Sequence, residues 1–183
     1  MIDQREKLRY YFAPERWESS MEKFTVSGRA LVERIRSLRP KFVIDAGCGF
    51  HPFREDIWNC IGIDFVNPCA DLICDFAEAP IRDGSIDVVL ALGSVNFGDE
   101  ENVVADLTVL ARWLRPGGKL FMRGNPGQPL ADESITVFPW HPANIGEIGR
   151  SAGLELVSKI EEEHLVTPWG ADATRLAWVY ERV

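Results

Sequence analysis

The chain has 183 residues, a formal net charge of −8, 46% hydrophobic residues and 26% charged residues. These totals are typical of one globular domain with a sizeable hydrophobic core, and the acidic balance argues against a surface built to bind nucleic acid. No apolar run approaches the ~20 residues that a membrane helix needs. The charged residues 1–7 lead into no apolar signal core, so we expect a cytoplasmic protein.

Charge is unevenly distributed along the chain. Residues 1–41 carry ten Lys and Arg against six Asp and Glu, and the remaining residues carry ten against 22. The two parts therefore have net charges of +4 and −12. A basic segment on an acidic body is either a solvated helix face or a means of holding an anionic substrate, and the sequence leaves both interpretations open.

The cysteines indicate free thiols rather than a metal centre. A zinc site would need closer cysteine pairs or flanking histidines than Cys48, Cys60, Cys69 and Cys74 provide. We therefore expect four reduced, mostly buried cysteines in or beside strands, and no bound metal.

Apolar periodicity divides the chain into helices and strands. Residues 3–22 have helical spacing, and a second helix, capped by Thr25 or Ser27, ends at Arg39-Pro40. We expect strands over 42–46, 60–64, 70–75, 85–92, 119–123, 154–160 and 174–180, and helices over 53–58, 99–114 and 144–152. Strand and helix alternate through most of the chain, which predicts a parallel sheet with helices on both faces. The last two strands have no helix between them and should pair antiparallel at one edge.

This pattern predicts a single domain over residues 1–183. Residues 41–183 form the α/β core, and residues 1–40 form helices that either cover the sheet or act as a lid over a ligand. Residues 124–143 are rich in Gly, Pro and polar groups and should form a long loop over the ligand edge of the sheet. Exposed aromatic side chains in the first helix leave a homodimer open.

One stretch organises this core, the apolar run that ends in Asp45-Ala46-Gly47-Cys48-Gly49. A strand that ends in a Gly-x-Gly turn places bare backbone amides above the C-terminal edge of a sheet, where open α/β folds bind ligands. Glycine lets the backbone approach a ligand closely and adopt a positive φ. The alternative is that the glycines only terminate a buried strand, because short glycine motifs also match by accident.

Three acids at the ends of three successive strands favour a ligand site. Asp45, Asp64 and Asp75 should meet at one edge of the sheet, and each has a role if the ligand is a nucleoside. Asp45 can accept a hydrogen bond from a ligand ammonium, Asp64 from two ribose hydroxyls, and Asp75 from an adenine amino group. Phe76 offers an aromatic face beside the base.

With these residues the chain resembles the class I S-adenosylmethionine-dependent methyltransferases. The stretches that carry the resemblance are 43–49, 63–64, 74–76, 86–92 and 114–120, and the last of them has the telling sequence LRPGGKL. The resemblance implies a Rossmann-like, doubly wound, mostly parallel seven-stranded sheet with helices on both faces. The antiparallel strand pair at the C-terminus is also typical of that family.

The resemblance also implies S-adenosyl-L-methionine as the cofactor and S-adenosyl-L-homocysteine as the product. By motif, the implied cofactor-binding residues are Asp45, Gly47, Cys48, Gly49, Asp64, Phe65, Asp75, Phe76, Leu92 and Gly93, and the last two would border the point of methyl transfer. The chain departs from the family at Phe50-His51-Pro52, where a third glycine is frequent. This turn is stiffer than usual, so either cofactor affinity is altered or His51 reaches into the pocket.

The implied reaction is an in-line displacement, in which an acceptor atom attacks the methyl carbon of a sulfonium. A general base is needed only when the acceptor loses its proton poorly at neutral pH. The acceptor-side candidates are His51, Asn96, Trp140 and His141, each of which has a structural role as its alternative. The sequence favours a small-molecule acceptor and leaves nucleic acid and protein acceptors open.

Two rival functions remain at this point. A nicotinamide-dependent oxidoreductase shares the glycine turn and the later acid, but it expects G-x-G-x-x-G, and here the last position is Pro52. It also leaves Asp75 and the antiparallel end unexplained. The second rival is a non-catalytic S-adenosylmethionine-binding or regulatory protein of the same fold, because such folds host such roles and no general base is obvious.

Overall fold

The computed structural model describes residues 4–16, 28–127, 135–166 and 172–183, which build one eight-stranded sheet. The strands are β1 (Val43–Ala46), β2 (Cys60–Asp64), β3 (Leu72–Ile73), β4 (Ile86–Leu92), β5 (Leu114–Gly124), β6 (Leu154–Leu156), β7 (Glu161–Val166) and β8 (Asp172–Arg182). They lie in the order β3-β2-β1-β4-β5-β8-β6, and β7 also pairs with β8. The first five strands are parallel and β8 is antiparallel to β5. The predicted fold class is therefore confirmed.

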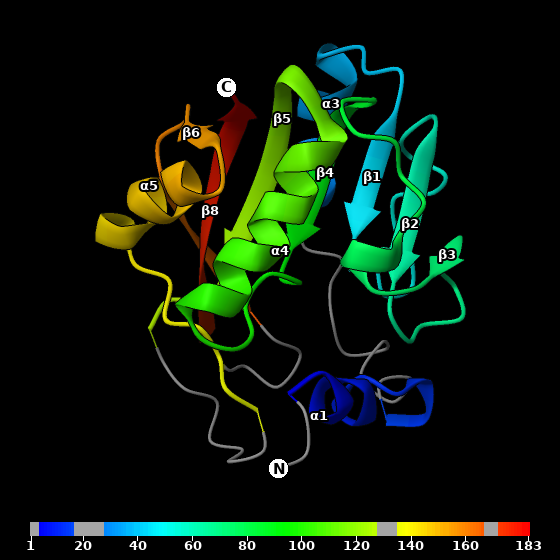
Figure 1. Ribbon diagram of the computed structural model, residues 1–183, viewed down its shortest axis with the longest axis vertical. Coiled ribbons are helices and arrows are strands. Elements are labelled where there is room, and N and C mark those ends of the chain that lie inside the picture. Colours follow the sequence, from blue (N-terminus) through cyan, green and yellow to red (C-terminus); the bar gives the residue numbers. More distant parts are fainter. Residues whose placement is uncertain (1–3, 17–27, 128–134, 167–171) are drawn as a thin grey trace.

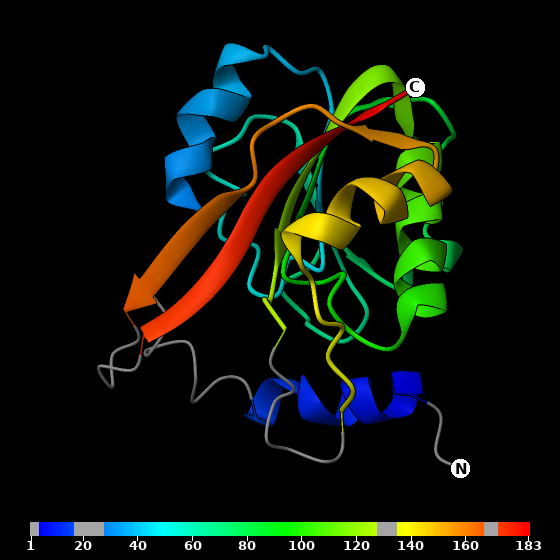
Figure 2. The same ribbon diagram turned by 90° about the vertical axis from the view of Figure 1, so that its left-hand side faces the viewer.

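Helices cover both faces of this sheet. Helix α3 (Arg29–Ser37) lies on one face, and α4 (Glu100–Trp113) and α5 (Pro142–Ser151) lie on the other (Figure 2). Helix α1 (Gln4–Tyr11) crosses beyond the ends toward which the arrows of β1, β2 and β4 point (Figure 1). The short 3-10 helix η1 (Phe76–Glu78) follows β3. The N-terminal helix therefore lies at the edge of the sheet where the sequence predicts a ligand.

Two hydrophobic clusters hold these layers together. Under α4 and α5, the buried face of α4 packs with β1, β4 and β5 around the fully buried Trp113, Trp140 and Tyr180. Under α3, Val32 and Ile35 pack against the other face of the same strands. Burial of apolar area on both faces explains why β4 is an almost continuous apolar run, as a central parallel strand should be.

The strand predicted over 154–160 ends at Leu156, and β7 is a further strand that the sequence did not predict, so the sheet has one strand more than expected. Residues 156–161 lie opposite residues 177–180 of β8, which leaves two extra residues on the β6–β7 side. At this bulge the amide of Val179 donates to the hydroxyl of Ser158 at 2.8 Å instead of to a backbone carbonyl. A side-chain acceptor in place of a carbonyl interrupts the ladder between β6 and β7.

Two predicted helices also differ from the structure. The helix expected over 53–58 is a series of turns, in which the amide of Ile57 donates to the carbonyl of Phe53 at 2.9 Å. A single bond of this kind closes one turn without propagating a helix. Helix α1 ends at Tyr11, because Pro14 has no amide to continue the pattern, and residues 14–16 are helical again. The remainder of the helix expected over 3–22 lies outside the described residues.

Other helix and strand boundaries differ from the predicted ones by a few residues. Helix α3 follows Gly28 with no side-chain cap, and the proposed caps Thr25 and Ser27 lie outside the described residues. Strand β3 is only two residues long, and β5 begins at Leu114, so that the LRPGGKL stretch lies within the strand instead of before it. Within the described ranges, no helix is long and apolar enough to cross a membrane, and no group of three or more His, Cys, Asp or Glu side chains is arranged to hold a metal ion.

Candidate functional site

The turn after β1 is closely packed on one side and open on the other. Gly47 and Gly49 have φ values of 72° and 52°, in the region that favours glycine. A Cβ on Gly47 would lie 2.2 Å from the Cβ of Ser94, whereas a Cβ on Gly49 would meet no atom within 4 Å. Gly47 is therefore required by its contact with the loop after β4, and Gly49 borders open space.

The backbone amides of this turn already donate hydrogen bonds within the protein, contrary to the expectation from the sequence that they are free for a ligand. The amides of Gly47 and Cys48 both donate to the carbonyl of Ile63, at 2.7 and 3.1 Å. The amide of Gly49 donates to Oδ2 of Asp64 at 3.0 Å. The pairing of β1 with β2 continues into the turn and uses these donors, so a ligand must meet the turn through the open side of Gly49 and the nearby carboxylates.

Asp45 at the end of β1 is a buried acid with an unused acceptor. The residue is 3% exposed, and its Oδ2 atom has no hydrogen-bond partner among the residues that the structure describes. Burial, and then the negative charge of Asp64, raise the pKa of Asp45 to about 7. A cation beside this carboxylate would lower its pKa and supply the missing partner.

Asp64 at the end of β2 already accepts three backbone hydrogen bonds. Its Oδ2 atom accepts from Gly49, and its Oδ1 atom accepts from the amides of Val66 and Asn67, each at 2.9 Å. A carboxylate has four acceptor positions, so one stays available for a ribose hydroxyl. Asp64 thus ties the glycine turn to the loop after β2.

Asp75, which follows β3, is paired with helix α1. The guanidinium of Arg9 lies 3.0 Å from Oδ2 of Asp75, and that of Arg5 lies 3.4 Å from the same atom. The acid is therefore occupied by the chain's own arginines. Burial raises the pKa of the neighbouring Asp106 on α4 to about 6, against the opposing charge of Arg5.

Aromatic rings surround this contact between α1 and the sheet edge. The ring of Phe12 lies edge-on to Phe65 at 6.3 Å and to Phe97 at 5.3 Å between centroids, and the Arg9 guanidinium lies 5.9 Å from the centre of the Phe65 ring. Phe65 thus faces α1. Phe76 does not share this place, since its ring lies edge-on to the buried Trp113 at 6.0 Å.

The loop after β4 is held by side chains that the sequence offered as acceptor contacts. Leu92 is partly buried and Gly93 has a φ of 122°. Asn96 is 2% exposed; its Nδ2 donates to the carbonyl of Gly93 at 2.9 Å, and its Oδ1 accepts from the amide of Asn125 at 3.1 Å. Asn96 therefore connects the ends of β4 and β5.

Trp140 and His141 also have structural partners. Trp140 is fully buried, its Nε1 donates to the carbonyl of Val95 at 3.0 Å, and its ring packs against Trp178. His141 is the N-cap of α5, where its Nδ1 accepts from the amide of Ala143 at 3.1 Å. The structure places one in the core and the other at a helix end.

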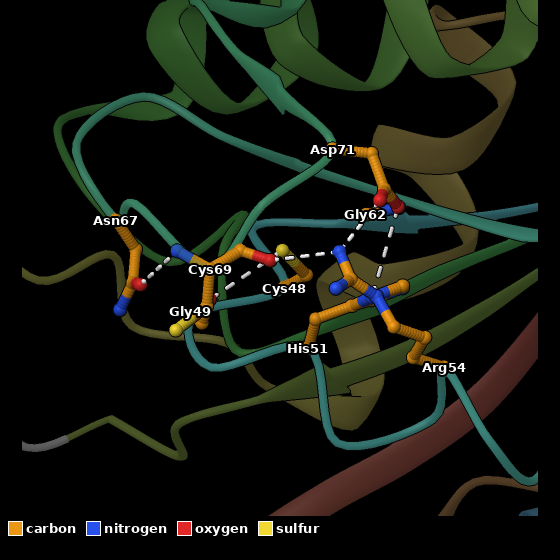
Figure 3. A network of polar contacts seen from close by, with 8 residues as sticks. All are labelled: Cys48, Gly49, His51, Arg54, Gly62, Asn67, Cys69 and Asp71. Carbon is orange, nitrogen blue, oxygen red and sulfur yellow. Dashed lines mark hydrogen bonds and ion pairs between the residues drawn. The ribbon is translucent and has the colours of Figure 1, made fainter.

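The side chain of His51 packs against Gly62 of β2 and does not extend over the ligand edge of the sheet. The residue has a φ of 51° and is 4% exposed, and its Nδ1 accepts from Nε of Arg54 at 3.0 Å (Figure 3). A Cβ on Gly62 would lie 2.5 Å from the His51 ring, so the ring needs glycine beneath it. Burial lowers the pKa of His51 despite the nearby carboxylate of Asp71, which favours the neutral ring.

Sequence reasoning missed the arginines of this site. The basic segment 1–41 was read as a solvated face or an anion site, and two of its arginines instead pair with Asp75. Arg54 and Asp71 were not singled out, because nothing in their spacing distinguishes them from surface charges. The charge imbalance and the expected helices before the first strand were the signals that pointed toward α1.

Comparison with known proteins adds an independent line of support. Residues 44–122 match a family model described as a methyltransferase domain. A curated relative, the tRNA (carboxymethyluridine(34)-5-O)-methyltransferase ALKBH8 of Mus musculus, is 33% identical over 103 residues, which cover 49% of this chain and 15% of the relative. The chain spans between 15% and 32% of the length of the curated relatives that it matches.

Solved structures share the fold over nearly the whole chain. The 1,6-didemethyltoxoflavin-N1-methyltransferase of Burkholderia thailandensis, solved with 1,6-didemethyltoxoflavin and S-adenosylhomocysteine, has a TM-score of 0.77 at 16% identity and covers 100% of this chain and 92% of its own. The [4+2]-cyclase SpnF has a TM-score of 0.64 at 14% identity and covers 95% of this chain and 94% of its own, so the fold alone does not fix the reaction. Together with the match over residues 44–122, the shared fold confirms the resemblance to the class I S-adenosylmethionine-dependent methyltransferases that the sequence shows.

Proposed function

We propose that the chain binds S-adenosylmethionine and transfers its methyl group to a small-molecule acceptor. The observation that carries this proposal is the buried carboxylate of Asp45, whose Oδ2 has no partner among the described residues. It lies at the end of β1, next to the turn in which Gly49 borders open space. S-adenosylmethionine carries an ammonium and a sulfonium, and either cation suits this carboxylate. A dinucleotide would instead bring phosphates, which repel it.

The neighbouring acids fit the remainder of such a cofactor to different degrees. Asp64 keeps one acceptor position for a ribose hydroxyl, fewer than the two bonds expected from the sequence. Phe65 lies at the same edge and offers an aromatic face. Asp75 would serve the adenine amino group only if Arg9 shares or leaves its carboxylate. We therefore expect cofactor binding to alter the contact between α1 and Asp75.

Methyl transfer needs no reactive group from the protein itself. The bound cofactor supplies a methyl group already activated on sulfur, and the acceptor atom forms its bond to that carbon as the carbon–sulfur bond breaks and its electron pair stays on sulfur. Residues of this chain orient the two reactants and keep water out. Leu92 and Gly93 border the reacting carbon in this proposal. An acceptor with a lone pair free at neutral pH fits, because it needs no general base.

The size and charge of the site support a small acceptor. Helix α1 lies across the ligand edge, where its Arg9 contacts Phe65 and Asp75. Phe12, directly after the helix, contacts Phe65 and Phe97. We propose that α1 is part of a lid formed by residues 1–40, which leaves little room for a macromolecule. The net charge of −8 also repels nucleic acid. Nucleic acid and protein acceptors are the outcomes that would overturn this part of the proposal.

One observation favours a second candidate, a cofactor-binding protein without methyl transfer. Asn96, Trp140 and His141 each bond to the backbone in a structural role. His51 likewise bonds to Arg54. None of these four side chains is placed as a general base. A chain built in this way can bind the cofactor and take part in a complex as a regulatory subunit.

Calorimetric titration with S-adenosylmethionine, S-adenosylhomocysteine and NADH tests the proposal. We expect both sulfur nucleosides to bind and NADH not to bind. Binding of NADH alone would overturn the family-based cofactor. Turnover is then measured with radiolabelled methyl groups against pools of small molecules, RNA and protein, and binding without transfer to any pool would favour the non-catalytic candidate.

A further inference from the structure

The turn after β1 and the loop after β2 are joined by a polar network around Arg54 (Figure 3). The Arg54 guanidinium donates from NH2 to Oδ1 of Asp71 at 2.5 Å and to the carbonyl of Cys69 at 3.0 Å. Its Nε donates to Nδ1 of His51 at 3.0 Å. One side chain from the first loop thus bonds to its own loop and to two positions of the second.

Asp71 extends the network into the sheet. Its Oδ2 atom accepts from the amide of Gly62 on β2 at 2.8 Å, and the same atom lies 3.7 Å from Nδ1 of His51. The ring of His51 lies directly on Gly62, where a Cβ would come within 2.5 Å of it. Asp71 therefore holds Arg54 and β2 at once, while the imidazole fills the space between them.

A second connection joins the same two loops at the ligand edge. Asp64 accepts from Gly49 of the first loop and from Val66 and Asn67 of the second. Asn67 in turn accepts the amide of Cys69 at 2.9 Å, and the carbonyl of Cys69 accepts from Arg54. These contacts connect Gly49 to Arg54 through Asp64, Asn67 and Cys69, so the same chain of hydrogen bonds includes both Arg54 and the carboxylate of Asp64.

This network is better suited to fixing geometry than to stabilising the fold. The side chains of Arg54 and Asp71 are 52% and 38% exposed, and exposed ion pairs contribute little to stability. Arg54 nevertheless uses two of its planar donor groups on three acceptors, which fixes their relative positions. The His51 ring is 1% exposed and cannot rotate freely between them.

We propose that Arg54 is a positioning residue that, with His51 and Asp71, clamps the glycine turn to the loop after β2 and so pre-forms the cofactor site. The inference rests on the proposed function, because the clamp matters only if a nucleoside binds at this edge. His51 stands where the family frequently has glycine, and the clamp explains its presence. Its ring braces the turn from the β2 side and leaves the open side of Gly49 free.

Titration of S-adenosylhomocysteine into Arg54→Gln, Arg54→Lys and Asp71→Asn proteins, at a temperature where all are folded, tests the clamp. We expect Arg54→Gln to lose about tenfold in affinity, as for a lost hydrogen bond to a charged group. Arg54→Lys should recover part of this loss, because it keeps the charge but not the fork. The double variant with Arg54→Gln and Asp71→Asn should bind S-adenosylhomocysteine only slightly more weakly than Arg54→Gln alone, since both residues act in one network.

The matched control is Arg112→Gln, which breaks the ion pair between Asp83 and Arg112 in the last turn of α4, where the arginine side chain is 52% exposed, as Arg54 is. It should leave affinity unchanged. If Arg54→Gln and Arg54→Lys lower the melting temperature but bind S-adenosylhomocysteine as tightly as wild type, the residue is only structural and the clamp is wrong. If Asp64→Ala then still loses binding, the proposed function stands without the clamp. Failure of the wild-type protein to bind overturns both.

Discussion

The two halves of the ligand edge are built from different kinds of contact. On the β1–β2 half, carboxylates receive backbone amides and guanidinium groups, as at Asp64 and Asp71. On the β4–β5 half, amide and indole side chains bond to nearby backbone, as at Asn96 and Trp140. The comparison shows that an acid at a strand end can accept several backbone hydrogen bonds and still have an acceptor position for a ligand. A neutral polar side chain in a loop has fewer positions, and backbone groups nearby occupy them.

Replacing Trp140 by alanine should give the largest loss of stability. Its fully buried indole packs between Phe138 and Trp178, and such truncations cost about 3–5 kcal/mol in the free energy of unfolding. The folded protein should still bind S-adenosylhomocysteine with unchanged affinity. Chemical denaturation and calorimetry measure the two quantities. The control is Trp58→Ala, an 83% exposed tryptophan whose loss should change stability little. A binding defect without a stability defect would place Trp140 at the ligand.

Asp64→Ala should weaken S-adenosylmethionine binding by about 2–4 kcal/mol, because it removes a charged acceptor of the ribose. It should also lower stability, since the amides of Gly49, Val66 and Asn67 lose their buried partner. Asp64→Asn keeps one oxygen, so its affinity measured by calorimetry and its melting temperature should both lie between those of the wild type and of Asp64→Ala. Unchanged affinity in the alanine variant would mean that the ribose lies elsewhere.

Gly62→Ala should destabilise the protein by about 1–3 kcal/mol through overpacking, because the new Cβ would overlap the His51 ring. His51→Gly removes that ring and suits the φ of 51° at this position. The cost of Gly62→Ala should therefore be smaller in the His51→Gly background, as measured by a double-mutant cycle in denaturant. Equal costs in both backgrounds would show that His51 does not rest on β2 in solution.

The affinity for S-adenosylmethionine should fall as pH falls below about 7. The pKa of Asp45 in the free protein is raised to about 7, so its carboxyl group is protonated below that pH, and binding of a cation must release the proton. The expected slope is about tenfold in affinity, or about 1.4 kcal/mol, per pH unit between pH 5 and 7. Asp64 is the charged neighbour that raises the pKa, and the Asp45→Asn protein should show no such slope. A flat profile in the wild type would place the cation away from Asp45.

Much of the cofactor half was predictable because its signals are local. A buried strand followed by Asp45 and two glycines specifies a strand, an acid and a turn within a few residues, and β2 ends at Asp64 as expected. The roles of His51 and Trp140 were not predictable in the same way. His51 is fixed by Gly62 and Asp71, and Trp140 by Val95 and Trp178, all distant in the sequence.

The sequence by itself determined the α/β alternation, the parallel direction of the first five strands and the acids at the ends of three of them, because apolar period and strand-end chemistry are short-range properties. Only the tertiary structure decided which donors those acids meet. The amides of the glycine turn donate hydrogen bonds to Ile63 and Asp64, and Asp75 forms an ion pair with Arg9. Hydrogen-bond partners depend on which loops adjoin in space, and spacing along the chain does not encode that proximity.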